Sequence, residues 1–208
     1  MHTDASSLSS LLRRLLPGAQ LDGSNLQRID LTGAWIQQAS LKYANLQEAR
    51  LNDARLCGAV LCGANLLGAR LVGADLSGAN LQGAILSGAD LTDARFDGAN
   101  LFEAYLDGAD LTGAVLRGAD LGGAILLDAK LESTIFSGAD LRGAILLEDE
   151  ELPDEDLTTL IGRSLRAGVA VRELRRIYAL FETAHVDEYT RLDPLLAALQ
   201  RRRPRPLE

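Results

Sequence analysis

The sequence predicts a mainly β solenoid in which one short unit is repeated along most of the chain. Every fifth residue from Leu21 to Leu146 is Leu, Ile or Phe, and the residue two places before it is Ala in 23 of 26 cases. A period of five matches neither the 3.6-residue helix nor the two-residue strand. Only a chain that turns once in every five residues keeps all of these side chains inside.

Each five-residue unit divides into a straight part and a corner. The Leu and the Ala are two residues apart, so in an extended chain both point to the same, inward side. The residue between them points outward, which fits its variability; it is Asp or Asn in 11 of 26 units. The other two residues form the corner, and the second of them is Gly in 16 of 26 units. Gly there predicts a type II turn, whose third residue has a positive φ.

Units such as Ala74-Asp75-Leu76-Ser77-Gly78 closely resemble the pentapeptide-repeat family, whose motif reads A(D/N)LXX. The resemblance covers residues 19–148. It implies a right-handed quadrilateral β-helix with four pentapeptides per coil, so that residues 20 apart stack on one face. Because the register never slips between Leu21 and Leu146, we expect no inserted loop.

Helical segments are expected at both ends, because a solenoid needs caps over its open coils. In residues 1–18, five leucines lie at helical spacing before Pro17 and Gly18, which predicts a short α-helical N-terminal cap. Residues 149–208 begin with an acidic stretch and then carry apolar stripes at helical spacing. They predict an α-helical C-terminal segment that ends in a disordered RRRPRPLE tail.

Candidate chemistry is sparse, and the sequence predicts no enzyme, cofactor or metal site. The only histidines are His2 and His185, and Cys57 and Cys62 lack the spacing of a zinc site. Two thiols fit a reducing compartment rather than a disulfide framework. The repeated Asp and Asn occupy one fixed position of the unit, which favours a structural role over paired carboxylates or calcium ligands.

Charge and hydropathy limit the partners. A net charge of −8 disfavours direct binding to nucleic acid. No apolar run is long enough to span a membrane, and residues 8–16 are interrupted by two arginines, unlike a signal peptide. We therefore expect a cytoplasmic protein that contacts neither nucleic acid nor membrane.

Two functions are compatible with these features. The first is a non-catalytic protein-interaction scaffold whose partner is unknown. The second is implied by the resemblance, because some bacterial pentapeptide-repeat proteins imitate duplex DNA, bind DNA gyrase and protect it from quinolones or toxins. Residues 19–148 carry 16 acidic and 9 basic residues, which favours mimicry. Against mimicry, one face would carry three cations among its outward residues, which are Asp30, Arg50, Arg70, Asp90, Asp110 and Lys130.

One face of the expected coil carries an apolar ladder. Its outward residues run Asn25, Asn45, Asn65, Ile85, Tyr105, Ile125 and Ile145. With neighbouring corner residues, the candidate interaction stripe is Ile85, Phe102, Tyr105, Ile125, Leu127, Ile145 and Leu147. Such a stripe usually marks a contact. The chain's own C-terminal helices are the favoured occupant, a homodimer or another protein is the alternative, and plain solvent exposure remains open.

Overall fold

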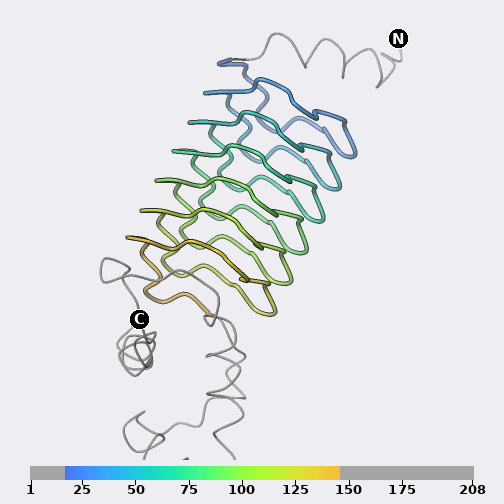
Figure 1. The fold of residues 1–208 in the computed structure, drawn as a ribbon. Helices are drawn as coiled ribbons and strands as arrows, with labels where there is room; N and C mark the ends of the chain where they lie inside the picture. The colour runs from blue at the N-terminus through green and yellow to red at the C-terminus, as the bar shows by residue number, and fades with distance from the viewer. Residues whose placement is uncertain (1–16, 146–208) are drawn as a thin grey trace, which may run out of the picture.

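The computed structural model describes residues 17–145, which form a right-handed β-helix of stacked coils (Figure 1). Parallel bridges join residues 20 apart, from Gln20 with Ser40 to Ile125 with Ile145. Four pentapeptides per coil are thereby confirmed, and the register runs without an inserted loop. The expected helical cap and C-terminal helical segment fall on residues 1–16 and 146–208, outside the described residues. Residues 17–145 themselves contain no helix.

Every pentapeptide has the same local structure: one outward bridge residue, one inward residue, a two-residue turn, and a second inward residue. The bridge residues stack into four faces. We name each face after its first bridge residue: the Gln20, Asn25, Asp30 and Trp35 faces. Each face continues in steps of 20 residues.

Main-chain hydrogen bonds join each coil to the next at the face and again at the corner. On the Asp30 face, Leu71 N–H donates to the carbonyl of Asp90 at 2.7 Å. At the corner that follows, Gly73 N–H donates to the carbonyl of Thr92 at 2.9 Å. Ala74 N–H closes the turn by donating to the carbonyl of Leu71 at 3.0 Å. This ladder fixes the register of each coil against its neighbours.

The corners confirm the predicted turns. The second corner residue has a positive φ in every unit from Gly18 to Gly143, with values between 53° at Asp128 and 75° at Gly18. With the hydrogen bond between the first and fourth residues, this is the pattern of a type II turn. Nine residues other than glycine occupy the position, and none is β-branched: Arg28, Gln38, Tyr43, Glu48, Asp53, Asp93, Glu103, Asp128 and Ser133.

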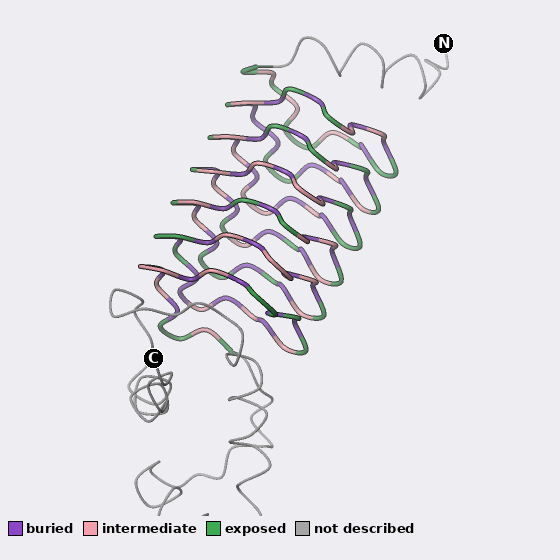
Figure 2. Cartoon of the chain, in the orientation of Figure 1, coloured by how far each residue is buried: buried purple, intermediate pink, exposed green. Residues whose placement is uncertain are grey.

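The inward residues form one continuous core along the axis of the rod (Figure 2). Ala84 and Leu86 are both fully buried, as are Phe96 and Phe136, which take the place of Leu in two units. The inward polar residue Thr134 is also buried, and its hydroxyl donates to the carbonyl of Leu111 at 2.8 Å. Burying a hydroxyl is tolerated there because it has an acceptor.

Candidate interaction face

The outward Asp and Asn side chains have a structural role in the coil. In each unit that has a coil on both sides, four main-chain N–H groups donate to main-chain carbonyls, in the ladder between coils or in the turn. The N–H of the first corner residue has no such main-chain acceptor. Asn100 Oδ1 accepts this bond from Phe102 at 2.9 Å, and Asp120 Oδ1 accepts it from Gly122 at 2.9 Å. The same bond is made by Asn25, Asp30, Asn45, Asn65, Asp75, Asn80, Asp90, Asp110 and Asp140. These carboxylate and amide oxygens are therefore turn acceptors, which is the structural role that the fixed position of Asp and Asn predicts.

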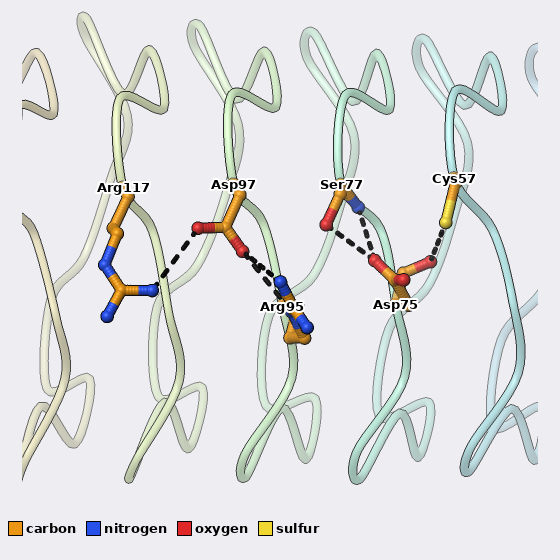
Figure 3. Close-up of polar contacts among 6 residues, drawn as sticks. All are labelled: Cys57, Asp75, Ser77, Arg95, Asp97 and Arg117. Atoms are coloured by element: carbon orange, nitrogen blue, oxygen red, sulfur yellow. Dashed lines mark hydrogen bonds and ion pairs between the residues drawn. The ribbon is translucent and has the colours of Figure 1, made fainter.

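The middle of the Trp35 face is charged, with Arg55, Asp75 and Arg95 as its bridge residues between Trp35 at one end and Val115 and Ile135 at the other. Asp97, at the corner after Arg95, pairs within its own coil and with the next coil (Figure 3). Asp97 lies between Arg95 at 3.2 Å and Arg117 at 3.7 Å. At the start of the face, the guanidinium of Arg55 lies 4.7 Å from the ring centroid of Trp35. Such exposed pairs stabilise a fold little. They do leave this face with polar groups that already have partners.

The two cysteines are free and lie at neighbouring corners. Cys57 Sγ donates to the main-chain carbonyl of Asp75 at 3.9 Å (Figure 3), and Cys62 Sγ donates to that of Asn80 at the same distance. Burial, together with Asp75, raises the pKa of the Cys57 thiol, which works against a reactive thiolate. Nowhere in residues 17–145 do three or more His, Cys, Asp or Glu side chains gather as a metal site would require.

The Asn25 face changes character half-way along the rod. Its first three bridge residues are asparagines, and its last four are Ile85, Tyr105, Ile125 and Ile145. Ile85, Tyr105 and Ile145 are 37%, 46% and 42% exposed, whereas Ile125 is partly buried between its neighbours. A ladder of large apolar side chains therefore faces outward on the last coils.

Corner residues widen this ladder. Phe102 is exposed at the corner that leads into Tyr105, and its ring lies over Gly122 of the next coil. A Cβ at Gly122 would lie 3.0 Å from Phe102 Cδ2, so the glycine makes room for the ring. Leu127 is partly buried at the corner that follows Ile125. Leu147 lies outside the described residues. We call the other six residues the apolar stripe: Ile85, Phe102, Tyr105, Ile125, Leu127 and Ile145.

Sequence reasoning missed Leu67, which is 40% exposed at the corner that follows Asn65. Leu67 and Leu127 occupy the same corner column, because 60 residues separate them and the coil repeats every 20. The period of 20, applied to corners as well as to bridge residues, would have found it. Ser87 and Asp107 lie between the two leucines in this column and hydrogen-bond to each other at 2.6 Å, so Leu67 is an exposed apolar residue one coil before Ile85 that is not joined to Leu127.

A family model for pentapeptide repeats matches four overlapping stretches: residues 16–52, 39–78, 74–113 and 109–146. These stretches together cover more than half of the chain. The chain belongs to the pentapeptide-repeat family. In this pentapeptide-repeat protein, no helix within residues 17–145 is long and apolar enough to cross a membrane. A search of curated proteins finds no match.

Several solved pentapeptide-repeat proteins are similar to this one. HetL from the cyanobacterium Nostoc sp. strain PCC 7120, a protein involved in heterocyst differentiation regulation, is 36% identical; the match covers 64% of this chain and 68% of HetL, with a TM-score of 0.33. Full-length QnrB1, a plasmid-mediated fluoroquinolone resistance protein, is 17% identical over 88% of this chain and 93% of its own, with a TM-score of 0.31. A pentapeptide repeat protein of the Arabidopsis thaliana thylakoid lumen is 26% identical; the match covers 69% of this chain and 75% of that protein, with a TM-score of 0.21.

The apolar stripe is not needed for the coil of this pentapeptide-repeat protein. An Ile or Tyr cannot accept the first corner N–H as Asp and Asn do. Nor do the stripe residues supply the core, which is filled by the inward Leu and Ala. Their main-chain groups are already used, since Ile85 N–H donates to Ala64 at 2.9 Å and Tyr105 accepts from Leu86 at 2.7 Å. Units with an outward Ile or Tyr thus lack the hydrogen bond from the first corner N–H to an Asp or Asn side chain, and they carry exposed apolar surface in its place.

Proposed function

We propose that this pentapeptide-repeat protein is an interaction scaffold that binds a protein through the apolar stripe. The observation that carries the proposal is the change along the Asn25 face from asparagines to exposed Ile and Tyr. Contiguous exposed apolar side chains on a rod are a common mark of a contact surface. The partner would present a complementary apolar segment, with polar groups where it meets the neighbouring faces.

The coil ladder supports this role because it holds the stripe rigid. Tyr105 accepts from Leu86 and Ile125 accepts from Leu106, both at 2.7 Å, so neighbouring rungs are locked to each other. A surface ordered before binding loses little conformational entropy when the partner arrives. Tyr105 and Phe102 are also of the aromatic class that is enriched at protein interfaces.

A matched pair of variants tests the scaffold function. Tyr105→Asn restores the residue type of the first half of the face and adds an acceptor for the Asp107 N–H, so the coil is kept. Val60→Asn is the control, because Val60 is an outward apolar bridge residue on the Gln20 face. We expect cross-linked partners from a host lysate to be captured by the unchanged protein and by Val60→Asn, and to be lost with Tyr105→Asn. Equal capture by both variants would contradict a role of the stripe.

The alternative is a DNA mimic that binds DNA gyrase or another topoisomerase and modulates it or protects it from quinolones or toxins. The rod shape and the acidic excess of residues 19–148 favour it. Several of the acids are neutralised, however: Asp110 pairs with Lys130 at 2.8 Å and Glu48 with Arg28 at 2.7 Å. A mimic would inhibit gyrase supercoiling at low micromolar concentration, and salt would weaken the inhibition. No inhibition in low-salt buffer would leave the scaffold.

A further inference from the structure

We infer that the chain covers its own apolar stripe, and that the occupant is the segment of residues 157–199. The inference rests on the proposed function, in that both take the stripe to be a contact surface. It goes further by naming the first occupant. A protein partner would then compete with a segment of the same molecule.

The position of the stripe on the rod favours this occupant. The stripe begins at Ile85 and continues to Ile145, the last described bridge residue, whereas the same face is polar at Asn25, Asn45 and Asn65. The chain leaves the described coils directly beside exposed apolar side chains, at the carboxyl-terminal end of the rod in Figure 1. On the Asn25 face, apolar bridge residues are thus confined to the coils nearest to the residues that follow Ile145, although Trp35 and Tyr43 are exposed elsewhere on earlier coils.

The length and the composition of that segment suit the stripe. Sixty-three residues follow Ile145, and they carry Leu157, Leu160, Ile161 and Leu165 at spacings of three, one and four. With coils about 4.8 Å apart, the bridge residues from Ile85 to Ile145 span roughly 14 Å. A helix of about ten residues has that length. A tethered segment also experiences an effective concentration on the order of millimolar.

The size of the stripe argues against a second copy of the chain. A large side chain offers about 150–250 Å², and the exposed fractions of the most open stripe residues are 37–46%. The six side chains then expose on the order of 300–500 Å². A stable dimer buries about 800 Å² on each partner. The stripe alone is small for an interface between two rods, and a separate partner would also have to contact the neighbouring faces. It is adequate for a tethered segment, which does not lose the entropy of association.

Intrachain cover would regulate the scaffold. The affinity for a partner falls by the fraction of molecules whose stripe is open. Any change that releases residues 157–199 would raise the apparent affinity without altering a single contact of the interface.

Photo-crosslinking in the full-length purified protein tests the cover. A benzoylphenylalanine replaces Tyr105, and in the control it replaces Val60. We expect the probe at position 105 to form crosslinks within one molecule to residues 157–199, at a yield that does not depend on protein concentration. Crosslinks between molecules, rising with concentration, would assign the stripe to a second copy and overturn the inference. A yield no higher than that of the control would also overturn it.

A second measurement uses the full-length double variant Ile85→Asn with Tyr105→Asn. We expect amide hydrogen exchange in residues 157–199 to become faster by tenfold or more, while residues 17–145 exchange as before. Unchanged exchange in residues 157–199 would contradict the cover. Neither experiment contains a partner protein, so the two hypotheses are tested separately. Intrachain cover can be contradicted while capture from a lysate still depends on the stripe, and the scaffold function can be contradicted while the cover is confirmed.

Discussion

Ser77 donates two hydrogen bonds to one carboxylate oxygen of Asp75, from its hydroxyl at 2.6 Å and from its main-chain N–H at 3.0 Å (Figure 3). The Ser77 N–H belongs to the first corner residue and has no main-chain acceptor, so Asp75 supplies one. The hydroxyl of Ser77 holds the carboxylate in the position that this bond requires. The outward position of the unit is therefore a turn acceptor first and a surface residue second.

We expect Asp75→Ala to lower the free energy of unfolding by about 1 kcal/mol, since a partly buried N–H loses its acceptor. Asp75→Asn should cost less, because its side-chain oxygen can still accept both bonds. Urea denaturation of the two variants measures the difference. Equal losses would mean that the negative charge, and not the acceptor, is what the corner requires.

Asp110 predicts how stability depends on pH. Burial alone would raise its pKa, but hydrogen bonds from Lys130 and Thr112 outweigh burial and hold the pKa below the ordinary value of 3.8. A carboxyl whose pKa is lower in the folded state stabilises the fold above its unfolded pKa, and this contribution is lost as the pH falls through the folded pKa. Urea midpoints measured from about pH 5 to about pH 2 should fall less steeply for Asp110→Asn than for the unchanged protein. Parallel curves would contradict the assignment.

The inward small position predicts an asymmetry between two substitutions to leucine. Ala84→Leu adds bulk where the core is fully buried, and overpacking typically costs about 1–3 kcal/mol. Arg70→Leu, at an exposed bridge position, should change stability by less than about 0.5 kcal/mol. The melting temperatures of the two variants measure this difference in stability. Similar melting temperatures would contradict the assignment of residue 84 to a close-packed interior and of residue 70 to the surface.

The second corner position predicts which side chains are tolerated. Gly78 has a φ of 64°, and a Cβ there would meet no atom within 4 Å, so only the backbone conformation is tested. Gly78→Val should cost more than about 1–2 kcal/mol, because a β-branched residue is strained at positive φ. Gly78→Asp should cost less, since Asp53, Asp93 and Asp128 already occupy equivalent positions. Gln82→Val is the control at a first corner position, where Val72 occurs naturally. Equal costs for Gly78→Val and Gln82→Val would contradict the turn.

The five-residue period alone was enough to assign the inside and the outside of each unit, because no other chain path buries both the Leu and the Ala. It could not give the number of units per coil, which depends on how corners close and came from the family resemblance. It also could not explain why Asp75 and Asn100 precede their leucines. That the first corner N–H has no main-chain acceptor follows only from the hydrogen bonds between coils, which the sequence does not give. The stripe followed from the period of 20, but the same period was not applied to the corner at Leu67.

The closure of the coil after 20 residues sets a rule for how such a gene can change length. Loss of one pentapeptide between Tyr105 and Ile125 would rotate everything downstream by a quarter turn, and Ile125 would then stack beside Asn100 on the Gln20 face. The core would tolerate the deletion, since every unit is equivalent, but the apolar surface would be split between two sides of the rod. Only the gain or loss of a whole coil keeps it continuous, so selection for binding would act on repeat number in multiples of four units.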